Sequence, residues 1–473
     1  MSGATVISPF AGLPVSEVVP DAVEVKGVSK SSLLVGRRRI RFQPQTGTTA
    51  SPGGIIQFVL ADSASLLDVN SMVLSFNAST SGTTTNPAFD DGPAWCRRIQ
   101  VSINGQLLDD TDNAHRNTNA QVTLNADRSW YQGPGSFAGY WAMNPDLAVN
   151  YGALNETTFE PRFADVSGGL TNAIARGVAG TSYAVPLGLL SSALRCKQYW
   201  PLANMGELVV QITLAQAAEA LIQPAGGTNP NYSITDLFIE ADLIQPHSMY
   251  MELLNRVTQM EGEHGLVIPV DTTIVAQGQA ISAGAYDSSV VVSRATNNLR
   301  KVFVTATPTS ALASAGYPSV SCFPWLGSGA QVQFRIGSLY FPSQPANSAA
   351  RLFWMSQKAF GEPVNDRGGV ANILTYQNQT NSSTGAVTNS PAGVAAAQSR
   401  LKFADRFVCA YNFDNYQGGE ELDADGVSVL GQAGSQLIAQ LKGTALESIT
   451  PTISLVATKY ISLKDGALKI IGV

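Results

Sequence analysis

Short apolar runs recur along the chain, separated by loops rich in Gly, Pro, Ser, Thr and Asn. In residues 99–104 the side chains of Ile99, Val101 and Ile103 alternate with polar ones, so they lie on one face of a strand. Repeated strands of this kind are typical of an all-β sandwich or barrel. The pattern predicts strands at residues 55–60, 72–77, 99–104, 208–214, 238–243, 290–292, 301–305, 332–336 and 453–456.

Helical patterns are few and fall between the predicted strands. Asp109 and Asp110 are expected to begin a helix, because carboxylates offset the free N–H groups of a first turn. Loops as long as those predicted here are usually functional or make contacts. Helices are predicted at residues 109–121, 248–257 and 394–399, and long loops at 79–93, 133–180 and 365–399.

Three segments of the first half recur in the same order in the second half. The matching pairs are 98–105 with 331–338, 206–212 with 434–441, and 233–241 with 448–457. The chain of 473 residues also exceeds the roughly 250–300 residues that one hydrophobic core usually serves. The sequence therefore predicts two similar sandwiches in tandem, with a boundary near residues 247–265.

The chain is poor in charge: charged residues make up 14% of it, against roughly 25% in typical soluble domains. Its surface therefore consists largely of neutral polar side chains, which weaken repulsion between copies and suit dense self-packing. Low-charge secreted proteins share this composition. The net charge of −6 argues against a general affinity for nucleic acid, since that affinity comes from many Lys and Arg side chains.

The cysteines and the N-terminal residues bear on the cellular compartment. Cys96, Cys196, Cys322 and Cys409 lie far apart, without the close pairs of a zinc site, and are expected to be reduced and buried. The first residues show neither a basic start nor an apolar run of signal-peptide length, and no stretch of about 18 apolar residues occurs. We therefore expect an intracellular product without a membrane span.

Candidate catalytic residues are scarce, because the chain has only three histidines, His115, His247 and His264. His115 is expected to be exposed or hydrogen-bonded, and the other two to lie in the linker. Glu261 and Glu263 beside His264 are interpreted as solvated charge in preference to a metal cluster. We expect no active site and no cofactor.

An acidic segment in the second half resembles the start of a calcium loop. Asp423 and Asp425 follow Glu420 and Glu421, and alternating carboxylates of this kind surround hard cations. Residues 427–430 supply no further carboxylate, so a plain acidic turn is favoured and a bound cation is the alternative.

The one concentrated basic run comprises Arg37, Arg38, Arg39 and Arg41, after an N-terminal arm with little strand pattern. Two interpretations remain open. The arginines contact nucleic acid or anionic lipid headgroups, or they lie on a strand edge, pair with acidic neighbours and block misassociation. Ile40 alternates with them, as it would in a strand.

The most characteristic stretch is Val185-Pro-Leu-Gly-Leu-Leu190, followed by Gln198-Tyr-Trp-Pro-Leu202 and the strand at 207–214. Together with residues 66–76, 97–109, 241–253 and 337–345, it resembles the double jelly-roll major capsid proteins of tailless icosahedral double-stranded DNA viruses, the adenovirus-like lineage. The similarity is greatest to polinton-like viruses and virophages, and it covers nearly the whole chain.

This resemblance implies an all-β fold of two tandem eight-stranded jelly-roll sandwiches with short helices in the connections. It implies an N-terminal arm at 1–30, a first jelly roll at 31–250 and a second at 251–473. The implied function is that of a major capsid protein in the virion, which forms a pseudo-hexameric homotrimer that tiles the shell. The implied partners are neighbouring capsomers, penton and minor capsid proteins and, for the arm, an internal membrane or the genome, with no small-molecule substrate.

Two other classes of protein compete with this interpretation. A secreted carbohydrate-binding or adhesive sandwich would carry a secretion signal and aromatic platforms. A polysaccharide-active enzyme would need a pair of carboxylates in a cleft, which only the fold can reveal.

Overall fold

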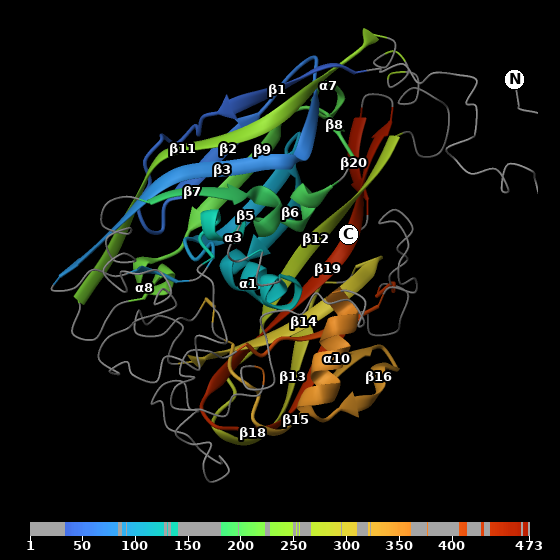
Figure 1. The fold of residues 1–473 in the computed structure, drawn as a ribbon. Coiled ribbons are helices and arrows are strands. Elements are labelled where there is room, and N and C mark those ends of the chain that lie inside the picture. The colour runs from blue at the N-terminus through green and yellow to red at the C-terminus, as the bar shows by residue number, and fades with distance from the viewer. Residues whose placement is uncertain are drawn as a thin grey trace, which may run out of the picture.

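The computed structural model describes most of the chain from Leu34 onward (Figure 1). The described residues are 34–83, 88–90, 92–126, 130, 134–140, 181–196, 198–222, 228–248, 252, 255, 266–294, 296–309, 320–321, 323–360, 376, 406–413, 427–429, 436–464 and 467–471. Within these residues, no helix combines the length and the apolar character needed to cross a membrane.

Two antiparallel sheets form a first sandwich, blue to green in Figure 1. One sheet has the order β1-β11-β3-β7 and the other the order β2-β9-β5-β6. In β9, Leu208, Val210, Ile212 and Leu214 are buried and the residues between them are partly exposed, so alternation turns one face to the core. The strands are β1 (Leu34–Phe42), β2 (Ile55–Leu60), β3 (Leu66–Thr83), β5 (Cys96–Ile103), β6 (Gln106–Asp112), β7 (Thr181–Pro186), β9 (Leu208–Leu214) and β11 (Thr228–Pro246).

A second sandwich repeats this arrangement. Its sheets have the orders β12-β19-β14-β17 and β13-β18-β15-β16. Numbered within its own half, each set of eight strands is ordered 1-8-3-6 in one sheet and 2-7-4-5 in the other, which is the jelly-roll topology. The strands are β12 (Leu266–Gln277), β13 (Gly284–Val292), β14 (Leu299–Pro308), β15 (Ser328–Ile336), β16 (Leu339–Ala346), β17 (Cys409–Asn412), β18 (Leu437–Ala445) and β19 (Ile449–Lys464).

The predicted fold class is confirmed, and the three sequence repeats fall on equivalent strands. They match β5 with β15, β9 with β18, and β11 with β19, which are the fourth, seventh and eighth strands of their sandwiches. The repeat thus reflects two copies of one topology. Short extra strands are β4 (Ala88–Phe89), β8 (Trp200–Pro201), β10 (Leu221–Ile222) and β20 (Ala467–Ile471).

One long helix follows the fifth strand in each sandwich: α1 (Ala114–Asn125) after β6, and α10 (Ala349–Phe360) after β16. Shorter helices are α3 (Pro134–Phe137), α6 (Leu187–Leu190), the 3-10 turn η3 (Ser192–Arg195), α7 (Leu202–Met205) and α8 (Ala217–Ala220). Residues 248, 252 and 255 are helical, in line with the helix predicted at 248–257, whereas the one predicted at 394–399 lies outside the described residues.

Two local predictions are wrong. Asp109 and Asp110 do not begin a helix, because they belong to β6 and pair with Val101 and Gln100 of β5. The helix begins only at Ala114, after Asn113, which has a left-handed backbone conformation. The loop predicted at 79–93 is shorter than expected, since β3 continues to Thr83 along β11.

Each sandwich has its own apolar core, and the first core also takes side chains from the second half. Ile268 and Val270 of β12 belong to the same buried cluster as Phe58 and Trp200. A separate cluster around Phe334 fills the second sandwich. The exact division at residues 250 and 251 stays a prediction.

Buried carboxylates form hydrogen bonds between the two sandwiches. Asp109 accepts hydrogen bonds from the backbone N–H of Thr273 at 3.1 Å and from the Ser191 hydroxyl. Asp90 accepts the backbone N–H of Val320 at 3.0 Å and the Ser321 hydroxyl at 2.6 Å. Charge-assisted bonds of this kind are about twice as strong as neutral ones, so they fix the relative position of the two halves.

The shared core predicts that damage to β12 weakens the first sandwich. Replacement of Ile268, which is 1% exposed, by Ala should lower the free energy of unfolding by about 3 kcal/mol, through lost burial and the cavity left behind. Denaturant unfolding followed by tryptophan fluorescence measures this. Ile55→Ala is the matched control, since Ile55 is 52% exposed and should change little. Equal effects of the two substitutions would contradict the shared core.

Candidate functional site

The four arginines of the basic run lie on β1, at the edge of the sheet β1-β11-β3-β7. The Arg37 guanidinium is 2.8 Å from Asp68 and 2.6 Å from Asp242. Arg38 lies 2.9 Å from Asp62. Every arginine of the run thus has an acidic partner, and Arg39 and Arg41 share Glu240 at 3.1 and 2.9 Å.

These pairs agree with the interpretation of a strand edge in which charges pair with acidic neighbours. The arginine side chains are 52–65% exposed, so each ion pair is solvated and contributes little stability. The exposed guanidinium groups keep further N–H donors toward solvent. Contact between this edge and a genome or membrane stays a prediction.

A charged cluster is buried in the first sandwich around Glu219. Its Oε1 lies 2.8 Å from Arg97, 3.0 Å from His115 and 3.4 Å from Arg116. Glu219 is 9% exposed, and His115 is fully buried. One carboxylate therefore satisfies three cationic or polar groups that β5 and α1 bring together.

The protonation states in this cluster follow from its charges. Burial would raise the pKa of Glu219, but the hydrogen bond from His115 and the charges of Arg116 and Arg97 outweigh it and lower the pKa to about 2. Burial lowers the pKa of His115, and its hydrogen bond with Glu219 opposes that shift. The sequence predicts that His115 is exposed or hydrogen-bonded; the residue is hydrogen-bonded to Glu219 and fully buried.

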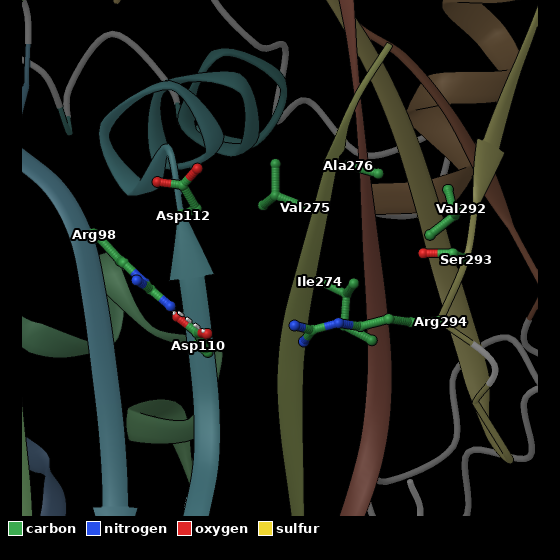
Figure 2. Close-up of a pocket in the computed structure, with 9 residues that line it drawn as sticks. All are labelled: Arg98, Asp110, Asp112, Ile274, Val275, Ala276, Val292, Ser293 and Arg294. Atoms are coloured by element: carbon green, nitrogen blue, oxygen red, sulfur yellow. Dashed lines mark hydrogen bonds and ion pairs between the residues drawn. The ribbon is translucent and has the colours of Figure 1, made fainter.

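A groove of about 340 Å³ lies between the two sandwiches (Figure 2). On the side of the first sandwich, Arg98 and Asp110 form a bidentate pair with two N–O distances of 2.7 Å, and Asp112 lies beside them. On the opposite side lie residues of the second sandwich, including Ile274 and Arg294. Ser293 is the single hydroxyl among the lining residues, which include no histidine or cysteine to activate it.

Other candidate residues have simple surroundings or lie outside the described part of the chain. Burial raises the pKa of the Cys96 and Cys409 thiols, so both are poor nucleophiles. His247 is exposed. Across the described ranges no three His, Cys, Asp or Glu side chains gather as a metal site would require. The described ranges do not include Asp423, Asp425, Glu261, Glu263 or His264.

Sequence reasoning missed the buried carboxylates Asp90, Asp109 and Glu219. Glu219 stands in an alanine-rich stretch whose sequence has no partner nearby, since Arg97 and His115 lie more than 100 residues away. For Asp109 the preceding Leu107 and Leu108 were a usable signal of a strand. The partners are brought together only by the closure of the sandwiches.

Comparison with known proteins depends on the fold, because no protein-family model and no curated protein matches this sequence. The Sputnik virophage structure by cryo-EM aligns with a TM-score of 0.55 at 13% identity, over 96% of this chain and 92% of that one. The PBCV-1 virus capsid aligns with a TM-score of 0.55 at 10% identity, over 94% and 98%. The Faustovirus major capsid protein aligns with a TM-score of 0.54 at 9% identity, over 93% and 92%.

The chain has the double jelly-roll fold of viral major capsid proteins. At sequence identities of 9–13%, the similarity to these proteins is a similarity of fold alone. The alignments extend over both jelly rolls, so the tandem arrangement itself is shared, and not only one sandwich. The double jelly roll is thus the framework on which the arginine edge, the Glu219 cluster and the groove are placed.

The Glu219 cluster makes a pH-dependent contribution to stability. The folded pKa of about 2 lies below the ordinary 4.5, so this contribution is present above pH 4.5 and is lost as the pH falls toward 2. Glu219→Gln should therefore cost about 3 kcal/mol at pH 7, at 1.36 kcal/mol per pKa unit. It should also flatten the acid-induced loss of stability between pH 4.5 and 2, measured by denaturant titration at several pH values.

Glu240→Gln is the control, because Glu240 pairs with the exposed Arg39 and Arg41. Its cost should stay below about 1 kcal/mol. A Glu219→Gln protein as stable as this control would show that the buried cluster does not stabilise the fold.

Proposed function

We propose that the double jelly roll described here is a major capsid protein, which acts by self-association and not by catalysis. The observation that supports this is the alignment of the whole two-sandwich chain with viral capsid proteins, over 92–98% of their length. The low charge of 14% fits this role, because neutral surfaces pack densely without repulsion.

The duplicated fold suits a trimer. Three copies of a chain with two similar sandwiches place six similar units around a threefold axis, which gives a nearly hexagonal outline. Hexagonal units tile a flat facet, so the duplication gives the trimer the outline that tiling requires. We propose that the chain forms such a pseudo-hexameric homotrimer, which packs against neighbouring capsomers, penton and minor capsid proteins in the virion.

The arginine edge fits the side of the shell that meets an anionic layer. Arg37, Arg38, Arg39 and Arg41 lie in the first described strand, directly after the N-terminal arm. We propose that the arm and this edge contact the genome or an internal membrane, both of which present phosphate groups.

The trimer predicts a mass of three times 49.8 kDa for the purified protein. Size-exclusion chromatography with light scattering measures it, and dilution to low concentration should not dissociate a tight capsomer. A stable monomer that binds glycans would contradict the proposed function and support a carbohydrate-binding protein.

The arginine edge predicts a defect after capsomer formation. Arg38→Ala with Arg39→Ala should leave trimers intact, because both side chains are more than half exposed, but should lower the yield of particles. Particle yield and genome content are measured by gradient centrifugation of co-expressed capsid components. Unchanged yield and genome content would refute a role for this edge in assembly.

A further inference from the structure

Equivalent sheet faces are covered in the second sandwich and open in the first. Phe303 of β14 pairs with Ala410 of β17, and these outward residues are 1% and 0% exposed. At the same place in the first sandwich, Ser75 of β3 pairs with Ala184 of β7. Ser75 is partly exposed and Ala184 is exposed.

Both pairs point away from their own cores. The neighbours of Phe303 along β14, Val302 and Val304, belong to the core of the second sandwich. The neighbours of Ser75 along β3, Leu74 and Phe76, belong to the core of the first. Since side chains alternate along a strand, Phe303 and Ser75 lie on the outer faces.

The outer face of the second sandwich is covered by Ala359 of its own α10 and by the helix α1 of the first half. In α1, Ala120 and Leu124 share one buried apolar cluster with Phe303, Ala410 and Val456. The amide of Asn119 in the same helix donates to the backbone oxygen of Val320 at 3.2 Å. Figure 1 shows α1 at the junction of the two sandwiches.

The equivalent helix of the second sandwich, α10, exposes a large aromatic side chain at the corresponding position. Each helix has 12 residues and follows the fifth strand of its sandwich. The sixth residue is Asn119 in α1 and Trp354 in α10, and Trp354 is 51% exposed. On its inner side α10 is held by Ser356, whose hydroxyl donates to the Val408 oxygen at 3.0 Å and accepts the Ala410 N–H at 2.9 Å.

Hydroxyl side chains occur on both faces, and the open face also carries Phe238, which lies beside Ser75 and under the Arg41 guanidinium. Hydroxyl residues of the covered face, Thr305, Thr452 and Ser454, are 3–5% exposed. The open face carries Ser79 and Ser233, hydrogen-bonded to each other at 2.7 Å. Hydroxyl side chains on such an outer face are therefore already buried once within the chain.

We propose that the Trp354 face of α10 in one copy docks onto the outer face of β3 and β7, around Ser75 and Ala184, in the next copy. This contact rests on the proposed function and places a helix of one chain on an outer sheet face of the next, as α1 lies on the outer face of the second sandwich within the chain. Inside the chain Ala120 of α1 shares a cluster with Phe303, whereas between chains Trp354, one position before the counterpart of Ala120, meets Ser75 and Ala184. Buried tryptophans commonly dominate the energy of such interfaces.

The two surfaces of the contact differ, so the association is head to tail. A head-to-tail contact forms a closed ring when the rotation between copies permits it. If the rotation that relates neighbouring chains equals the rotation that relates the two sandwiches of one chain, three chains form a closed ring of six sandwiches.

The test uses two variants that each break one side of the contact. Trp354→Glu removes the helix side and Ala184→Glu the sheet side; both residues are exposed, and near-UV circular dichroism checks that the proteins fold. By light scattering each variant alone should be a monomer of about 50 kDa, since one chain is 49.8 kDa. An equimolar mixture retains one intact pair of surfaces and should give a heterodimer of about 100 kDa that cannot close into a ring.

Tyr340→Glu is the matched control. Tyr340 of β16 is 44% exposed, and its counterpart Leu107 of β6 stays 48% exposed at the junction within the chain. This variant should remain a trimer, and Trp354→Ser should reproduce the effect of Trp354→Glu without an added charge.

Trimeric Trp354→Glu or Ala184→Glu protein, a mixture that stays monomeric, or a monomeric Tyr340→Glu control would each overturn this contact. A monomeric wild-type protein would contradict the proposed function together with the contact. A wild-type trimer that Trp354→Glu leaves intact would overturn the contact alone.

Discussion

The structure depends on burial of the apolar outer face of the second sandwich at the junction of the two halves. In the second jelly roll, Phe303 and Ala410 on the outer face are buried by α1 of the first. Burial of this face joins the two sandwiches into one unit, because apolar side chains of the first half cover apolar side chains of the second. The equivalent face around Ala184 is exposed within the chain, and this is the face that we propose a second copy covers.

Buried carboxylates fix the relative orientation of the two sandwiches at this apolar junction. Asp109 and Asp90 each bind donors from the opposite half. Burial raises the pKa of Asp109, and its hydrogen bonds and Lys459 oppose that rise, so the carboxylate depends on correct docking of the second sandwich. If the two halves packed differently, a buried carboxylate would lose its hydrogen-bond donors. The free-energy cost of that loss disfavours alternative packings of the two halves.

Much of this fold could be predicted from the sequence, because alternation of apolar residues marks strands such as 99–104 and 208–214 and repeats in the second half. The positions of β6 and Glu219 could not. Asp109 looks like a helix start in isolation, and only its pairing with Val101 and its contact with Thr273 make it part of a strand. Glu219 meets its partners through closure of the sandwich, which the order of residues does not reveal.

The most direct test is the symmetry of the purified oligomer in single-particle electron microscopy. A pseudo-hexameric homotrimer predicts six similar lobes around a threefold axis, in which the contact between chains resembles the contact between the two sandwiches of one chain. A twofold-symmetric oligomer, or a trimer in which Trp354 of α10 faces solvent, would contradict it.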